Sequence, residues 1–153
     1  MTPESRVPNP ESREASVPEF RVHRPVEVRF RDCDPMGHVN NAVYLTYLEL
    51  ARFAYWEAAD IGRLAGEVSY IIARVEIDFR SPATTGQVLD VAIAVTGLGR
   101  TSFSMGYEIR DEDGRLVAAA KSVQAAYDYA AGKTVPLSDA IKQRIREFEG
   151  RGL

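Results

Sequence analysis

Apolar and polar residues alternate with a period of two in several parts of the chain, a pattern typical of half-buried β-strands. The segments that show it are 26–31, 70–80, 87–96, 100–110 and 115–128. Short connections rich in Gly, Pro, Ser, Thr and Asp separate the last four segments, so we expect these neighbours to pair as antiparallel hairpins. The pattern therefore predicts one antiparallel sheet of five strands.

A different period runs from about residue 41 to residue 61, where neither Gly nor Pro interrupts the chain. Apolar residues recur there at helical spacing, at Val43, Tyr47, Leu50, Ala51, Ala54 and Ala58. Four more widen the apolar surface around the circumference: Leu45, Leu48, Phe53 and Trp56. A helix this apolar must be buried on most sides. We expect it to end at Gly62.

The order of these elements limits how they can pack. The sheet has one apolar face to bury, and one long helix is available to cover it. A second, short helix is predicted over 138–149, with Ser138 as its N-cap and Ile141, Ile145 and Phe148 on one face. We therefore predict an α+β hotdog fold, in which a five-stranded antiparallel sheet wraps around one long central helix and a short C-terminal helix follows.

The N-terminal segment differs in composition from the rest of the chain. Five of the eight prolines lie at or before Pro25, and apolar residues there are scattered without a period. Proline removes backbone donors, and sparse apolar residues cannot offset the entropy lost on ordering. We therefore expect residues 1–24 to form a disordered or loosely docked tail, and residues 25–153 to form a single domain.

Composition excludes several classes of function. Lys and Arg number 19 against 22 Asp and Glu, for a net charge of −3, so no basic surface for nucleic acid or an anionic membrane is expected. A single cysteine permits neither an internal disulfide nor a cysteine-rich zinc site. The sequence shows neither a secretory signal nor an apolar run long enough to span a membrane. We expect a cytoplasmic protein.

Residues that could perform chemistry concentrate in segment 32–41, between the first predicted strand and the long helix. It carries two carboxylates, one imidazole and two amides: Asp32, Asp34, His38, Asn40 and Asn41. A helix N-terminus presents unpaired N–H groups and about half a positive charge, which can stabilise an oxyanion. A carboxylate beside it can attack a carbonyl or activate water. This arrangement favours hydrolysis of an acyl group, and of a thioester in particular because a thiolate leaves without a strong general acid.

The segment DCDPMGHVNNAVYLTYLELAR resembles the signature of hotdog thioesterases of the 4-hydroxybenzoyl-CoA thioesterase type. That family shows a D-x-D-x-x-G turn followed by the start of the central helix, with a tyrosine three residues in. The resemblance covers about residues 26–129. It implies that Asp34 is the catalytic carboxylate and that the backbone N–H of Asn41 is the oxyanion donor. We also expect substrate contacts from Gly37, His38, Asn40 and Tyr44.

The resemblance extends to the loop before the family's fourth strand, which contacts the CoA nucleotide. It corresponds to Gly99-Arg100-Thr101-Ser102-Phe103, where one of the family's basic positions is kept. Arg100, Thr101 and Ser102 are therefore expected to bind substrate. Active sites in this family form between two protomers, which implies a homodimer or homotetramer.

Several of these residues also have other interpretations. Asp34 could cap a turn, Asp32 is typical of a solvated charge at a strand end, and His38 could act as a general base or line the pocket. Tyr44 could belong to the core or to the pocket wall. A nucleophilic Cys33 is disfavoured, because Cys33 and His38 flank a turn that seldom brings such side chains together. Asp32, Asp34 and His38 would make a poor transition-metal site.

The function predicted from the sequence is hydrolysis of an acyl-CoA or acyl-ACP thioester, with Asp34 as nucleophile or general base and with no metal or redox cofactor. One alternative is a non-catalytic module that binds or senses acyl-CoA. Another is a hotdog hydratase or dehydratase, which would pair a histidine with an acid. The chain offers only His23 and His38 for that role, and His23 lies close to the expected tail.

Overall fold

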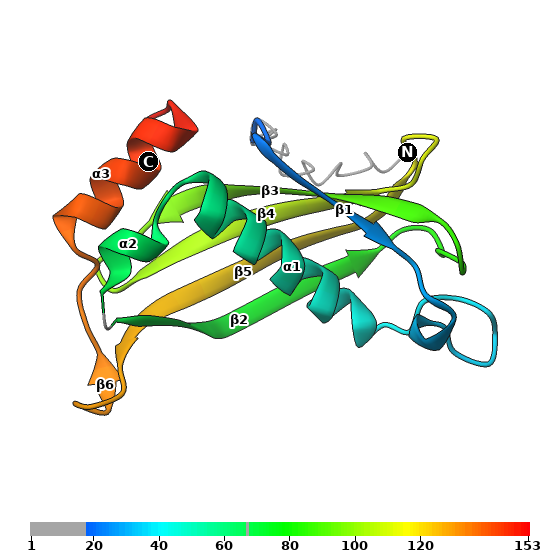
Figure 1. The fold of residues 1–153 in the computed structure, drawn as a ribbon, viewed down its shortest axis with the longest axis horizontal. Helices are drawn as coiled ribbons and strands as arrows, with labels where there is room; N and C mark the ends of the chain where they lie inside the picture. The colour runs from blue at the N-terminus through cyan, green and yellow to red at the C-terminus, as the bar shows by residue number, and fades with distance from the viewer. Residues whose placement is uncertain (1–17, 67) are drawn as a thin grey trace, which may run out of the picture.

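The computed structural model describes residues 18–66 and 68–153, which form one curved antiparallel sheet and its helices (Figure 1). The strands are β1 (Val22–Glu27), β2 (Ser69–Phe79), β3 (Val88–Leu98), β4 (Ser102–Arg110), β5 (Leu116–Asp128) and the short β6 (Lys133–Thr134). Their order is β1-β3-β4-β5-β2, with β6 added beside β5. The helical elements are η1 (Phe30–Asp32), α1 (Val43–Ala58), α2 (Gly62–Ala65) and α3 (Asp139–Glu149). The predicted α+β hotdog architecture is confirmed, with one short strand more than expected.

The core lies between α1 and the face of the sheet that it covers. The helix buries one stripe at helical spacing, made of Tyr44, Tyr47, Leu48, Ala51 and Tyr55. The strands contribute alternate residues, among them Leu89, Val91, Ile93 and Val95 of β3 and Phe103, Met105, Tyr107 and Ile109 of β4, all 2% exposed or less. Each fully buried side chain of this size contributes about 1.5–3 kcal/mol, so burial of this stripe fixes α1 on the sheet.

The first strand begins earlier than the sequence predicted. β1 starts at Val22, which pairs with Ile93 of β3, so the first strand begins three residues before the expected domain boundary at residue 25. Pro25 is tolerated because β1 lies at the edge of the sheet, where one side of the strand needs no partner. The predicted strand 26–31 is also wrong at its end, because the chain turns into η1 at Phe30. Most of the expected tail, residues 1–17, lies outside the described residues.

The long helix is shorter and less buried than predicted. It ends at Ala58, and Asp60 then adopts a left-handed conformation with φ +53°, so Gly62 begins α2 instead of ending α1. Phe53 is 62% exposed and Leu45 47%. On β2, which forms the other edge of the sheet, Phe79 is 52% exposed and Ile72 41%. The described residues of this chain therefore leave α1 and β2 with uncovered apolar surface.

A buried carboxylate fastens the C-terminal helix to the core. Glu149 Oε1 accepts hydrogen bonds from Tyr55 Oη (2.9 Å) and from the Val95 N–H (2.7 Å). The second bond satisfies a backbone donor beside the irregularity between Val95 and Gly97, where the β3–β4 register shifts. Burial, together with the nearby Glu149 carboxylate, raises the pKa of Tyr55 far above its usual value of 10. The C-terminal end of α1 is thus tied to both β3 and α3.

Candidate active site

A tight loop connects η1 to α1 and carries the predicted catalytic carboxylate. Cys33 and Val39 form an isolated antiparallel bridge at its base. Inside the loop, the Asp34 N–H donates to the His38 carbonyl (2.8 Å) and the Gly37 N–H donates to the Asp34 carbonyl (2.9 Å). Gly37 has a φ of +81°, a conformation that glycine adopts without strain. The loop therefore has a defined shape that fixes the Asp34 backbone.

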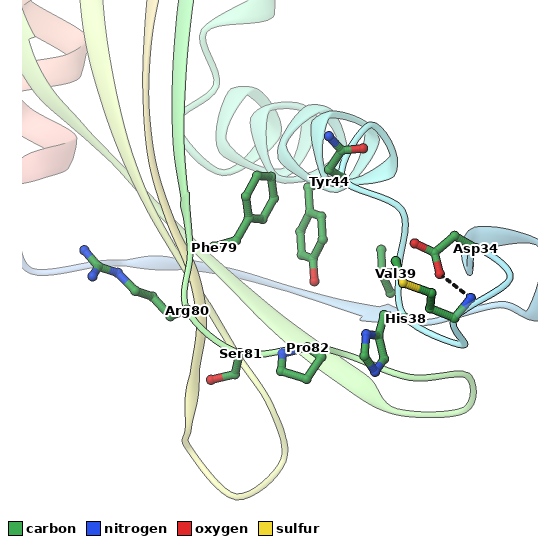
Figure 2. Close-up of a pocket in the computed structure, with 10 residues that line it drawn as sticks. Asp34, His38, Val39, Tyr44, Phe79, Arg80, Ser81 and Pro82 are labelled. Atoms are coloured by element: carbon green, nitrogen blue, oxygen red, sulfur yellow. Dashed lines mark hydrogen bonds between the residues drawn. The ribbon is translucent and has the colours of Figure 1, made fainter.

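Asp34 presents its carboxylate to a cavity of about 510 Å³. Its Oδ1 accepts a hydrogen bond from the Met36 N–H (2.9 Å), drawn as the dashed line in Figure 2. Among the described residues, no side chain or N–H group donates to Oδ2. One carboxylate oxygen is therefore held by the loop, while the other is free to face water or substrate.

Asn41, whose N–H is the predicted oxyanion donor, lies just before the start of α1. The Ala42 N–H donates to Asn40 Oδ1 (2.9 Å) and Asn41 Oδ1 (3.0 Å), and the Val43 N–H donates to the Asn40 carbonyl (2.9 Å). Within 18–66 and 68–153, the Asn41 N–H has no hydrogen-bond acceptor. Asn41 lines the same cavity as Asp34. The structure thus brings together the carboxylate and the helix terminus that the sequence singled out.

Other walls of the cavity come from both predicted and unexpected residues. His38 and Tyr44 line it as expected, together with Met36 and Val39, whereas Gly37 and Asn40 belong to the loop but do not line it. The opposite wall is formed by the end of β2 and the segment after it: Phe79, Arg80, Ser81 and Pro82 (Figure 2). Sequence analysis missed these four because they lie about 40 residues from the loop. The Val39 N–H donates to the Ala83 carbonyl (2.9 Å) and joins the two segments.

Asp32 is not the solvated charge that the sequence suggested. It is 2% exposed and accepts hydrogen bonds from the Arg29 N–H (3.0 Å), Arg29 Nη2 (2.8 Å) and Tyr47 Oη (2.9 Å). Burial alone would raise the pKa of Asp32, but the hydrogen bonds from Arg29 and Tyr47 outweigh it and hold this pKa below 3.8. The Asp32 carbonyl also accepts the Asn40 N–H (2.9 Å). Asp32 thereby links the loop to α1.

The cysteine next to Asp34 does not line the cavity. Its Sγ lies 3.3 Å from Thr85 Oγ1, in the connection between β2 and β3. His38, the histidine nearest in sequence, is exposed on the cavity rim. This placement agrees with a structural interpretation of Cys33.

The expected nucleotide-binding residues lie far from Asp34 within one chain. Arg100 and Thr101 form the turn between β3 and β4, and Ser102 begins β4. The Asp34 loop lies near the opposite end of β3, where the Val28 N–H donates to the Gln87 carbonyl (2.9 Å). β3 has 11 residues, so the two ends are roughly 35 Å apart. Within a single protomer, Arg100, Thr101 and Ser102 therefore do not lie beside Asp34, and their expected contact with substrate stays a prediction.

The described residues offer neither a ready metal site nor a membrane-spanning helix. They contain no group of three or more His, Cys, Asp or Glu residues placed to hold a metal ion. None of their helices is long and apolar enough to cross a membrane.

Comparison with known proteins gives matches over most of the chain. A family model described as the thioesterase-like superfamily matches residues 28–145. The long-chain acyl-CoA thioesterase FadM of Escherichia coli K12 is 26% identical over 126 residues, covering 80% of this chain and 96% of that protein. A 1,4-dihydroxy-2-naphthoyl-CoA hydrolase of Rippkaea orientalis is 27% identical over 128 residues, covering 80% and 93%.

A solved structure extends the match to three dimensions. The crystal structure of a thioesterase from Thermus thermophilus, complexed with coenzyme A and Zn, superposes with a TM-score of 0.77 at 40% identity. The match covers 87% of this chain and 98% of that one. The family model spans the Asp34 loop, α1 and all the strands from β2 to β6. The chain therefore belongs to the thioesterase-like superfamily.

Proposed function

We propose that this protein hydrolyses acyl-CoA thioesters. The observation that carries the proposal is the shared cavity, which is lined both by Asp34, with one oxygen free, and by Asn41, whose N–H at the start of α1 has no acceptor among the described residues. A thioester carbonyl placed between them would meet a negative group on its carbon and a positive dipole on its oxygen. The positive dipole is complementary to the negative charge that the oxygen carries in the tetrahedral intermediate.

The residues would act as follows. The Asn41 N–H donates to the thioester oxygen as negative charge builds there. Asp34 either attacks the carbonyl carbon or removes a proton from a water molecule that attacks it. A carbon–oxygen bond forms, the carbon–sulfur bond breaks, and the thiolate leaves with the electron pair and is protonated by solvent. If Asp34 attacks directly, water then hydrolyses the resulting anhydride.

The lining of the cavity suits more than one class of acyl group. The cavity wall contains apolar side chains from the Asp34 loop, α1 and β2, namely Met36, Val39, Tyr44 and Phe79. They suit an aliphatic or an aromatic acyl group. The names of the two relatives include one substrate of each kind. The 4-hydroxybenzoyl-CoA subtype and an acyl-ACP carrier both stay predictions.

We further propose that the working unit is a homodimer built on the free edge of β2. Phe79, at one end of β2, lines the cavity. At the other end, Ile71 and Ser102 both pair with Ala125 of β5, so the Arg100 turn lies beside the start of β2. If two copies joined their β2 edges antiparallel, the Arg100 turn of one would lie beside the cavity of the other. The pairing would also cover the exposed Ile72 and Phe79.

The hydratase alternative finds little support in the placement of the second histidine. His23 lies on β1, with Nδ1 2.7 Å from Asp90 Oδ2 and Nε2 3.2 Å from the Phe20 carbonyl. It does not line the cavity of Asp34. An acid–histidine pair for proton transfer at carbon is therefore not assembled around this site in the described part of one protomer.

The test is a panel of acyl-CoA esters, with short to long aliphatic chains and with benzoyl and hydroxybenzoyl groups, assayed by release of free thiol. We expect turnover of at least one ester, with loss of the thioester absorbance matching the thiol released. Binding of acyl-CoA without release of thiol from any ester would contradict the proposal and favour the sensing module.

A further inference from the structure

The side chain of Tyr44 is buried, yet its hydroxyl has no partner among the described residues. Tyr44 is 3% exposed, and its ring packs edge-to-face against Tyr47, with centroids 5.8 Å apart, and against Phe79, with centroids 5.2 Å apart. These two contacts fix the direction of the ring. The hydroxyl oxygen itself is not among the fully buried polar atoms without a partner in the described residues, so it keeps surface that solvent or a ligand can reach.

The hydroxyl opens into the cavity that holds Asp34. Tyr44 is one of its lining residues, and Figure 2 shows the hydroxyl pointing into the space between Phe79 and Val39. Tyr47, one turn further along α1, has its hydroxyl bonded to Asp32, and Tyr55 has its hydroxyl bonded to Glu149. Among the three buried tyrosines of α1, Tyr44 is thus the one whose hydroxyl faces a cavity without a partner in the described chain.

The geometry of the helix relates this hydroxyl to the oxyanion donor. Tyr44 is the second residue of α1, and Asn41 immediately precedes the N-cap Ala42. The Cα–Cβ bond of a helical residue tilts toward the N-terminus. The Tyr44 side chain is therefore directed toward the N-terminal end of α1. Asn41, whose N–H meets no acceptor from the described residues, precedes that end and lines the same cavity.

On the basis of the proposed function, we propose that the Tyr44 hydroxyl is a second hydrogen-bond donor to the carbonyl oxygen of the bound thioester. It would act beside the Asn41 N–H, and the substrate would satisfy a hydroxyl that the protein leaves open. Two donors on one oxygen are the usual composition of an oxyanion site. Burial, and to a lesser degree the neighbouring Cys33 thiol, raise the pKa of Tyr44 above 10, so the phenol stays protonated as a donor.

The test compares two CoA derivatives that cannot be hydrolysed and differ only in the carbonyl. In 2-oxodecyl-CoA a methylene group separates the sulfur from a ketone, whereas decyl-CoA has no carbonyl. For Tyr44→Phe we expect the Kd of 2-oxodecyl-CoA to rise about tenfold or more, while the Kd of decyl-CoA changes less than about twofold. The kcat for the best thioester of the panel should fall on the order of 10²-fold, with KM within about threefold.

Tyr55→Phe is the matched control, because it removes the same hydroxyl from the same helix at the end away from the cavity. It should lower thermal stability and leave the affinity for both derivatives unchanged, whereas Tyr44→Phe should not lower stability. Equal effects of Tyr44→Phe on both derivatives, or no effect on either, would overturn the proposal. Since the derivatives report binding, wild-type protein that binds both but hydrolyses no ester would contradict only the proposed function.

Discussion

The two ends of α1 place similar groups in the core and use them differently. At the C-terminal end, Tyr55 donates to the buried Glu149, which also accepts the Val95 N–H. At the N-terminal end, Tyr47 donates to the buried Asp32 in the same way. Beside this second pair, however, Asp34 Oδ2, the Asn41 N–H and the Tyr44 hydroxyl are left open on a cavity by the described residues.

The two ends of α1 therefore differ in the role of their polar groups. At the C-terminal end these groups stabilise the fold, whereas those on the cavity are available to bind a ligand. A buried carboxylate with all its donors in place stabilises the chain and offers nothing to a substrate. Unpaired groups that converge on one cavity lower stability slightly, and a ligand can satisfy them. We call the C-terminal end of α1, with Tyr55 and Glu149, the closed end, and the N-terminal end, beside the cavity, the open end. Substitutions at the closed end should therefore change stability alone, and substitutions of the residues that line the cavity should change catalysis alone.

The largest effect on stability is expected at the closed end. Glu149→Ala removes the acceptor of Tyr55 and of the Val95 N–H and leaves both buried without partners, so the free energy of unfolding should fall by about 3 kcal/mol or more. The measurement is urea unfolding followed by far-ultraviolet circular dichroism.

Glu149→Gln is the matched control, since its amide oxygen can still accept both bonds. It should lose clearly less stability than Glu149→Ala, and both variants should keep kcat within about twofold at temperatures where they are folded. A large loss of kcat in a folded Glu149 variant would show that the two ends of α1 are not separate in function.

The next largest effect on stability is expected at Asp32, which accepts hydrogen bonds from Arg29 and Tyr47 at the N-terminal end of α1. Asp32→Asn should lower the free energy of unfolding by about 2 kcal/mol at pH 7, because the charge that pairs with Arg29 is lost. The folded-state pKa of Asp32 lies below 3.8, so this contribution is present above the unfolded-state pKa and disappears as the pH falls through the folded-state pKa.

The difference in free energy of unfolding between wild type and Asp32→Asn should therefore stay constant from about pH 7 to pH 5. It should disappear as the pH falls below about 4. Urea unfolding at a series of pH values measures it, with Asp113→Asn in the exposed turn between β4 and β5 as control. A difference that is the same in acid and at neutral pH would mean that the Asp32 charge has no role in the link between the loop and α1.

A smaller effect is expected at Arg100, which the dimer would bring to the cavity of a second copy. Arg100→Ala should raise KM by roughly threefold to tenfold for CoA esters. Short pantetheine esters, which lack the nucleotide phosphates, should be affected less. Steady-state kinetics with both kinds of ester measure the difference.

Mixed dimers show which copy supplies Arg100. Co-expression of Asp34→Asn chains with Arg100→Ala chains yields hybrids with one intact site if the two residues come from different protomers. The purified hybrid should then show wild-type KM at about half the wild-type kcat. If Arg100 serves the Asp34 of its own chain, the hybrid will show the raised KM of Arg100→Ala.

The smallest effect is expected at Cys33, whose thiol lies beside Thr85 and away from the cavity. Cys33→Ser should keep kcat/KM within about twofold, and alkylation of the thiol should not abolish turnover of wild-type protein. Loss of all activity in a folded Cys33→Ser variant would point to a thiolate mechanism instead.

Local sequence predicted the parts of the site that are local in space. Asp34, His38 and Asn41 lie within eight residues of one another, and a turn followed by a helix places them on one cavity. The strands and α1 follow from their periods, since burial of one face of the sheet and one stripe of the helix enforces each pattern.

Residues that depend on long-range packing escaped prediction. Phe79–Pro82 reach the cavity because β2 ends beside the loop, and no local pattern signals that approach. Asp32 looks like an exposed strand end until Tyr47, 15 residues away, is seen to bury it. The alternating pattern predicts a first strand that begins only at Val26, because Pro25 and the nearby charged residues are unfavourable in a central strand. At the edge of a sheet such residues are tolerated.

The central claim is that Asp34 performs hydrolysis, and Asp34→Asn tests it most directly. The amide keeps the size of the side chain and its acceptor for the Met36 N–H, but it cannot attack a carbonyl or take a proton from water. Steady-state hydrolysis of the best acyl-CoA ester should show kcat lower by at least about 10²-fold, with KM within a few-fold and unchanged secondary structure. Turnover near the wild-type rate in Asp34→Asn would contradict the account and leave Asp34 as a residue that only shapes the turn.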